Sequence, residues 1–422
     1  AYFSAADSYI KTLNTVQHSA IRIATGAFRS SPISSLHAIT GVKPPYVYRE
    51  LKILTYYLRL LINPTHPLHQ TALDCERLDI NITLPDKSFF SKVLSLKRYY
   101  HLSFENIQLE NARESPPWEM GCVAVCEGLW DIKKKRYDAD QLRAIHRDHM
   151  RQHGNTGVLF TDGSKTESGA SFAVATPTQV TSTRIQSCAS ISTAELLAIR
   201  KVVTELHHNL DITICTDSKS SIQSINKYQH PNPIVQEIQQ QININQKTVH
   251  LCWVPSHVGV QLNEQADAAA RDAILNQQEF PIKIPKTDHR NNIREVLIKK
   301  WKQKWSAETN NKLWSILPSV RKITAGLNST RQWEVKLTRL RIGHTRLTHG
   351  FLMENTNRAT CEDCDVPLTV VHVLRECPNY SEERIRAFGG RTPSLKEMLF
   401  KYSNIYGKLY NFLMYSRLNN KL

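Results

Sequence analysis

The chain has 422 residues, a length that suits two or three domains, and 41% of them are hydrophobic, which is enough to build real cores. No apolar run approaches the ~18 residues of a membrane-spanning helix, so the sequence predicts none. The 54 basic residues outnumber the 38 acidic ones, for a net charge of +16. This excess favours a polyanionic partner such as nucleic acid, or simply a basic surface.

The first 112 residues are predicted to be mainly helical. Residues 48–61 carry apolar side chains at helical spacing, which is typical of a helix that faces a core. Pro116 and Pro117 break this pattern, and we expect a linker over residues 113–154. Within it, RYDAD (136–140) superficially resembles the YxDD signature of polymerases. Because its aspartates are not adjacent and its flanks are polar, we interpret it as the solvated start of a helix.

Residues 155–278 alternate between strand and helix patterns. Strands are predicted at 157–162, 170–176, 211–217 and 248–254, and helices at 193–206, from 218 onward, and at 263–275. Antiparallel strands followed by alternation with helices predict a mixed sheet covered by helices. A second linker, marked by Pro281 and Pro285, is predicted over 279–294, and residues 295–422 again appear helical.

Four acidic residues of this segment each have an ordinary structural explanation. Asp162 begins an Asp-Gly pair, which is a strong turn signal. Glu195 lies three residues after Ser192 and fits a capping box. Asp217 ends an apolar strand and could cap the following helix, and Asp267 could be an exposed charge on an alanine-rich helix.

Taken together, the four acids suggest a metal site. Carboxylates from separate elements of one compact domain would repel one another unless cations lay between them. Ligation by oxygen alone favours Mg²⁺, or Mn²⁺, over zinc or copper. Two such ions about 4 Å apart suit an in-line displacement at phosphorus, in which one ion activates a water and the other stabilises the leaving oxygen.

The same residues resemble a known family. FTDGSK, STAELLAI, ICTDSKSSI and WVPSHVGVQLNEQADAAAR, in this order and spacing, are similar to a type-1 RNase H domain. The resemblance implies an α/β fold with a mixed five-stranded sheet flanked by helices. It also implies an endonuclease that hydrolyses the RNA strand of an RNA–DNA hybrid with two Mg²⁺ ions.

The resemblance assigns roles to individual residues. It implies that the metal ligands are Asp162, Glu195, Asp217 and Asp267. It implies that His257 assists proton transfer or product departure from a mobile loop, although a plain loop histidine remains the alternative. Asn263 and Ser164 fall at positions that contact the substrate.

Two departures from the family pattern bear on activity. Leu262 replaces a glycine that usually precedes the asparagine, and it would strain the loop if that glycine has a positive φ angle. The segment from Tyr228 to Lys247 lacks the basic protrusion that some members use to hold the hybrid. Leu262 keeps open an alternative, an impaired RNase H fold that serves as a nucleic-acid-binding scaffold.

The positive charge of the chain lies outside the predicted catalytic segment. Residues 155–277 hold eight basic and ten acidic residues, whereas residues 299–346 hold twelve basic and two acidic ones. Tryptophans 301, 305, 314 and 333 are interleaved with these basic residues. They suit base stacking beside phosphate contacts, but Trp301, Trp305 and Trp314 are also spaced for one helical face, which core packing explains at least as well. We expect the flanks to grip the hybrid.

Three of the nine cysteines cluster late in the chain. Cys361 and Cys364 are separated by two residues, His372 follows after seven more, and Cys377 after a further four. This spacing can close a tetrahedral zinc site, which would stabilise a small fold; the alternative is a chance cluster in a helical region. An odd number of thinly spread cysteines favours a reducing, intracellular compartment, whether nucleus or cytoplasm.

The flanks extend the resemblance. RLRIGHTRLTHGFL and TVVHVLRECPNYSEER look like the C-terminal region of non-LTR retrotransposon polyproteins of the jockey and I kind, in which a Cys-Cys-His-Cys motif follows the RNase H domain. Residues 13–61 resemble the tail of their reverse transcriptase, beyond its catalytic palm. Because the chain begins with Ala1, we expect a fragment of such a polyprotein. Its expected partners are the upstream reverse transcriptase region, the RNA–DNA hybrid and the element's RNA, and no membrane.

A different enzyme on the same fold, such as an integrase or an Argonaute-like nuclease, fits less well. Those enzymes space their acids differently and lack the TDGS and NEQAD motifs. The sequence therefore predicts a magnesium-dependent ribonuclease between two mainly helical flanks, with a zinc-binding motif near the C-terminus.

Overall fold

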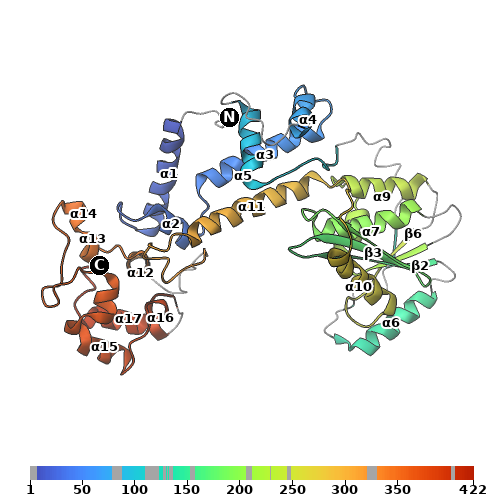
Figure 1. Cartoon of the computed structure of the whole chain (residues 1–422). Coiled ribbons are helices and arrows are strands. Elements are labelled where there is room, and N and C mark those ends of the chain that lie inside the picture. The colour runs from blue at the N-terminus through green and yellow to red at the C-terminus, as the bar shows by residue number, and fades with distance from the viewer. Residues whose placement is uncertain are drawn as a thin grey trace. The chain divides into compact units, whose positions relative to one another are not determined.

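The computed structural model of the chain forms two compact units, drawn together in Figure 1. One unit consists of residues 53–294, and the other combines residues 1–52 with 295–422. The structure describes residues 7–77, 88–109, 123–126, 130, 132, 136–152, 157–205, 212–228, 230–244, 249–320, 330–400 and 404–422. None of the helices in these ranges is long and apolar enough to span a membrane. The proline-marked stretch 113–119 lies outside them.

The unit of residues 53–294 is built on a mixed sheet, as predicted. Its strand order is β1-β6-β5-β2-β3-β4, in which β1, β6, β5 and β2 run parallel and β3 and β4 are antiparallel to their neighbours. The strands are β1 (Ala124–Cys126), β2 (Gly157–Lys165), β3 (Ala170–Ala175), β4 (Val180–Ile185), β5 (Ile212–Thr216) and β6 (Val249–Trp253). The expected five strands are all present, and β1 adds a sixth from a segment that we expected to be a linker.

Helices cover both faces of this sheet. On one face lie α7 (Ile191–Glu205) and α9 (Pro233–Ile244), with α8 (Lys219–Ile225) beside them, and on the other lie α6 (Ala139–Gln152) and α10 (Gln261–Asn276) (Figure 1). The buried strands β5 and β6 are apolar almost throughout, and Ile214 and Leu251 are fully buried. A central strand that is buried on both faces needs such a continuous apolar run.

Helix α6 begins where the RYDAD segment was interpreted as a helix start. The Asp138 carboxylate accepts a hydrogen bond from the backbone N–H of Gln141 (2.8 Å), which caps the helix. Both residues are exposed. The aspartates of RYDAD therefore lie at the N-terminal end of a surface helix, where Asp138 caps it.

The chain before and after the sheet joins the same unit. Helices α3 (Pro45–Ile62), α4 (His69–Arg77) and α5 (Phe89–Tyr100) precede it. The backbone N–H of Gln108 donates to Ile284 O (2.9 Å), and the N–H of Ile284 donates to Asn106 O (2.9 Å). Residues near 284, within the expected second linker, are thus hydrogen-bonded to the segment that follows α5.

The other unit is helical, as predicted. Its helices are α1 (Asp7–Thr25), α2 (Ile33–Thr40), most of α11 (Lys286–Ser306), α12 (Arg331–Ile342), α13 (Arg346–His349), α14 (Phe351–Glu354), α15 (Ser381–Phe388), α16 (Leu395–Phe400) and α17 (Asn404–Tyr415), with a π-helical turn at His372–Glu376 and a 3₁₀ turn at Pro378–Tyr380. Leu36 of α2 shares one core with Trp305 and Phe412. The two ends of the chain therefore fold together.

The tryptophans of the basic segment belong mainly to the interior. Trp301 is 7% exposed and Trp305 is 2% exposed, and the Trp305 indole N–H donates to Leu317 O (3.0 Å). Trp314 and Trp333 pack against the same core as Trp305. The stacking hypothesis is therefore wrong for Trp301 and Trp305, because a buried ring has no face to offer a base.

Candidate active site and metal centres

Sheet register brings two of the predicted acids together. Thr161 of β2 and Thr216 of β5 are register partners on the two central, parallel strands. The next residues along these strands, Asp162 and Asp217, therefore lie at the same edge of the sheet. The Trp253 indole N–H donates to the backbone O of Asp217 (3.0 Å) and helps to hold that strand end.

Asp162 and its glycine do not form a turn. Strand β2 continues to Lys165, with Asp162 opposite Ala173 and Gly163 opposite Phe172, and the chain reverses only at residues 166–169. A Cβ atom on Gly163 would lie 2.8 Å from the backbone N of Glu195. The glycine is thus required because α7 packs directly on the strand at this point.

Helix α7 is capped by a different residue from the one expected. The Ser190 hydroxyl accepts a hydrogen bond from the N–H of Thr193 (3.2 Å), and the helix begins at Ile191. The Ser192–Glu195 capping box is therefore wrong. Glu195 lies in the second turn, and its carboxyl lies close to that of Asp162 on β2.

Three carboxyls meet at this edge. Asp162, Glu195 and Asp217 each place a carboxylate oxygen within 4.8 Å of the other two. Asp162 and Glu195 are each only 6% exposed. Glu195 Oε2 is buried and has no hydrogen-bond partner within the described part of the chain. A buried oxygen of this kind is costly unless it receives a proton or a cation.

The electrostatics of these three residues, the carboxylate triad, also favour a bound proton or cation. Burial and the nearby charge of Asp217 raise the pKa of Asp162 to about 7. Burial and the charges of Asp162 and Asp217 raise the pKa of Glu195 to about 9. Oxygen ligands in a buried, like-charged group fit a hard divalent cation, which would replace the retained protons.

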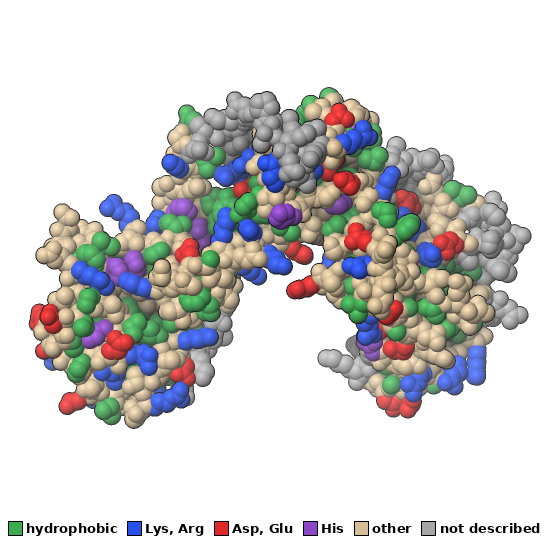
Figure 2. Space-filling view, viewed as in Figure 1, with side chains coloured by type: hydrophobic (Ala, Val, Ile, Leu, Met, Phe, Trp, Pro, Cys, Tyr) green, Lys and Arg blue, Asp and Glu red, His purple; other side chains and the backbone are tan. Residues whose placement is uncertain are grey.

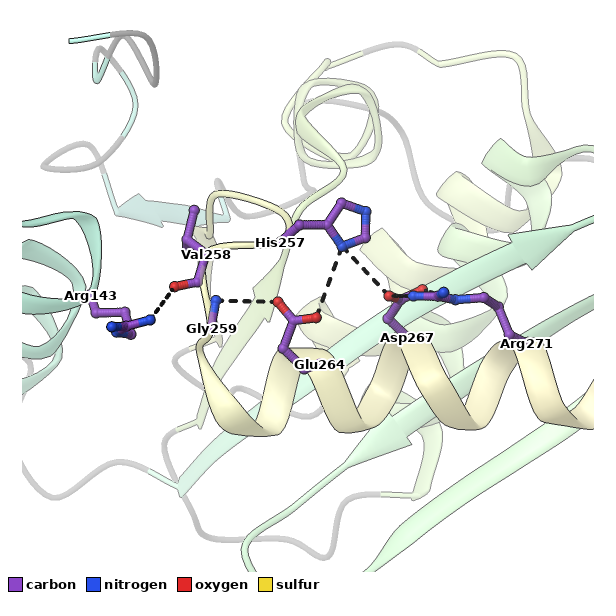
Figure 3. A network of polar contacts seen from close by, with 7 residues as sticks. All are labelled: Arg143, His257, Val258, Gly259, Glu264, Asp267 and Arg271. Atoms are coloured by element: carbon purple, nitrogen blue, oxygen red, sulfur yellow. Dashed lines mark hydrogen bonds and ion pairs between the residues drawn. The ribbon is translucent and has the colours of Figure 1, made fainter. Parts of the chain in front are cut away.

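Asp267 and His257 form a second group beside Glu264 (Figure 3). His257 Nδ1 lies 3.7 Å from Asp267 Oδ2 and 3.9 Å from Glu264 Oε2. Asp267 Oδ1 accepts a hydrogen bond from Arg271 Nε (2.8 Å), and Arg271 Nη2 pairs with its other oxygen. The structure thus brings three of the four predicted carboxylates together and pairs the fourth with an arginine.

The loop that carries His257 is fixed at several points. His257 has φ 53° and Gly259 has φ 83°. Gly259 N–H donates to Glu264 Oε1 (3.3 Å), and Arg143 Nη1 of α6 donates to Val258 O (3.0 Å) (Figure 3). The sequence could have identified Glu264, since it lies one helical turn before Asp267. No sequence pattern indicated a role for Arg143.

Leu262 does not strain this loop. It lies in the first turn of α10, and the positive φ angles occur instead at His257 and Gly259. The hypothesis that Leu262 impairs the site through backbone strain is therefore wrong. A leucine is compatible with the helical backbone at that position.

The predicted substrate contacts differ in their surroundings. Asn263 lies in the first turn of α10 and is 4% exposed, and its Oδ1 has no hydrogen-bond partner among the described residues. Ser164 is half-buried on β2, opposite Ser171 of β3. Asn263 therefore offers a buried acceptor that a ligand could satisfy.

The late cysteines converge with His372. Cys361, Cys364, His372 and Cys377 place one ligand atom each within 4.8 Å of all the others. The Sγ atom of Cys377 lies 3.7 Å from that of Cys361 and 3.9 Å from that of Cys364. His372 Nε2 is buried and has no hydrogen-bond partner within the described ranges. Three sulfurs and an imidazole in this arrangement fit the donor set of a structural zinc ion.

A tight loop brings the first two cysteines into place. The N–H of Cys361 donates to Val366 O (2.8 Å), and Asp365, with φ 49°, donates its N–H back to Cys361 O (2.9 Å). The N–H of Cys377 donates to His372 O (2.8 Å). Backbone hydrogen bonds therefore position both halves of this Cys/His cluster.

A mixed sheet with helices on both faces, and carboxylates converging where the pairing of its two central strands β2 and β5 ends, is consistent with an RNase H fold. Residues 155–275 match the family model described as RNase H. This part of the chain is therefore an RNase H domain.

Two curated relatives are named Ribonuclease H and come from Tropheryma whipplei strains Twist and TW08/27. Each is 33% identical to the chain over 107 residues, which is 22% of this chain and 66% of the relative. The chain thus spans just under two thirds of their length. The N-terminal and C-terminal regions of this chain are not covered by the alignment with these relatives.

Proposed function

We propose that the chain hydrolyses the RNA strand of RNA–DNA hybrids with two Mg²⁺ ions, or Mn²⁺ in their place, as a type-1 RNase H. The observation that carries this proposal is the buried carboxylate triad of Asp162, Glu195 and Asp217. The pKa values of Asp162 and Glu195, raised by burial and by neighbouring carboxylates, support this proposal. The family match of the same segment supports the substrate class.

The triad and Asp267 would hold the ions, which supply an activated water and a stabilised leaving oxygen when bound. Asp267 would serve as a ligand in place of its present ion pair with Arg271. His257 is 67% exposed and lies 3.7 Å from Asp267. It is thus placed to move a proton between the reacting oxygens and solvent. Asn263 and Ser164 position the substrate strand.

We assign binding of the nucleic-acid substrate to the regions that flank residues 155–277. Residues 155–277 carry a net charge of −2, whereas residues 299–346 carry +10. Lys and Arg side chains are spread over the surface of the unit of residues 1–52 and 295–422 in the face shown in Figure 2, and do not gather in one block there. Such a distribution suits phosphate contacts along a nucleic-acid backbone, without base stacking by the buried Trp301 and Trp305.

We further propose that Cys361, Cys364, His372 and Cys377 bind a structural Zn²⁺ ion, and that the chain belongs to the C-terminal part of a non-LTR retrotransposon polyprotein. The four converging ligands support the zinc ion. The order of the elements, with helices before an RNase H domain and a Cys-Cys-His-Cys motif after it, supports the polyprotein. Its upstream reverse transcriptase would supply the hybrid.

A cleavage assay tests the ribonuclease. The purified full chain should cut the RNA strand of a hybrid with Mg²⁺ and lose this activity with a chelator. Asp217→Asn should lower the rate at least about 100-fold, because one metal ligand is weakened. Asp272→Asn, a substitution of an exposed acid on α10, is the matched control. Hybrid binding without cleavage in either metal would favour the alternative of an impaired scaffold.

A further inference from the structure

A row of thiols crosses the sheet away from the carboxylate triad. Cys126 of β1 and Cys252 of β6 are register partners, and Cys252 is also the partner of Cys215 of β5. Side chains in one row of a sheet point to the same face. All three thiols therefore lie side by side, and their residues are no more than 3% exposed.

Helix α6 covers this row with an imidazole and a thioether. His149 places a ring nitrogen within 4.8 Å of the sulfurs of both Cys126 and Cys252. Met150 Sδ lies 4.0 Å from Cys215 Sγ. One turn earlier, His146 packs on Phe160, whose register partner is Cys215. The helix thus lies along the row and presents His149 at its β1 end.

We propose that Cys126, Cys252 and His149 form a second, buried zinc site. Thiolate and imidazole ligands without carboxylates select zinc over magnesium or calcium. Binding takes one Zn²⁺ ion and releases two protons, one from each of the first two thiols. Two thiolates balance the charge of the ion, so the filled site is neutral in its apolar surroundings.

Buried cysteines also pack as small apolar residues, and such packing is the competing explanation. It does not account for an imidazole nitrogen placed against two sulfurs. The proposed ligands come from β1, α6 and β6, of which β1 and α6 lie outside residues 155–275. An ion at this position would tie the two added elements to the RNase H domain.

Zinc content of the purified full chain, prepared with zinc and a reductant, tests the proposal. His149→Gln should bind one zinc ion fewer per chain than its matched control, Arg147→Gln, an exposed neighbour on α6. Cys126→Ser should show the same loss, whereas Cys188→Ser should not. The Cys361 cluster is unchanged in all four variants, so the difference reports this site alone.

Equal zinc content in His149→Gln and Arg147→Gln would overturn the site. If Cys126→Ser fails to fold, His149→Gln and Arg147→Gln are compared with Co²⁺ in place of zinc. The Arg147→Gln chain should then show more thiolate-to-cobalt charge-transfer absorption than His149→Gln. Identical spectra would mean that the row of cysteines packs in the core and binds no metal.

Discussion

The carboxylate triad and the Cys/His cluster differ in what holds their ligands in place. The triad draws on β2, α7 and β5, and its geometry follows from strand register and from helix packing over a large core. The Cys/His cluster lies within residues 361–377 and is positioned by a few local hydrogen bonds. The first should therefore keep its shape without metal, whereas the second should depend on metal for its fold.

Metal removal should separate the two regions most clearly. Cys377→Ser should cost the unit of residues 1–52 and 295–422 on the order of 5 kcal/mol in stability, because a buried ligand of the proposed structural ion is lost. Hydrogen exchange should accelerate across residues 359–388 and stay slow in β5. Cys188→Ser is the control. Unchanged protection in residues 359–388 would contradict a structural role for zinc.

Gly163→Ala should damage the triad through packing. The new methyl group would lie 2.8 Å from the backbone N of Glu195, so α7 must move. We expect a loss of about 1–3 kcal/mol in the free energy of unfolding and a fall in cleavage rate. Gly157→Ala on the same strand is the control, since its methyl group would meet Ile212 at an ordinary 3.8 Å. Equal effects of the two substitutions would argue against the tight contact.

The metal-free chain should become less stable as pH rises. Glu195 has a pKa of about 9 instead of its ordinary 4.5, so the folded state holds a proton that the unfolded state has lost between these values. Asp162, whose pKa is raised from 3.8 to about 7, adds to this loss of stability between those pH values. Each proton contributes at most about 1.4 kcal/mol per pH unit.

Glu195→Gln should flatten this profile, measured as Tm against pH in the presence of a chelator, whereas exposed Glu167→Gln should leave it unchanged. Saturating Mg²⁺ should oppose the loss in the parent chain, because the cation replaces the protons. A parent profile that is already flat above pH 5 would show that the triad is not strained by its own charge.

Arg143→Ala should have the smallest effect. Loss of its hydrogen bond to Val258 O should loosen the His257 loop and lower the cleavage rate about three- to tenfold, which is ~0.7–1.4 kcal/mol. Combined with His257→Ala, it should add little, since both changes disable the same loop. Arg147→Ala is the control, and fully additive losses would contradict the proposed positioning role.

Local patterns in the sequence identified the strands and acids, but long-range contacts corrected their details. An Asp-Gly pair favours a turn in isolation; here the ladders to β3 and β5 keep Asp162 and Gly163 extended. Strand β1 is too short to give a periodic signal and is defined by its pairing with β6. Arg143 was missed because its partner, Val258, lies more than a hundred positions away.

The Asp267–Arg271 ion pair affects how the proposed ions would load. Arg271 pairs directly with both carboxylate oxygens of Asp267, whereas its charge on Asp162 is outweighed by burial and by Asp217. A cation that recruits Asp267 must therefore displace a guanidinium group. The first ion would enter the triad at low metal concentration, and the second would require more. In the proposed two-ion arrangement, Arg271 would therefore compete with the second ion for Asp267 and raise the metal concentration needed for full occupancy.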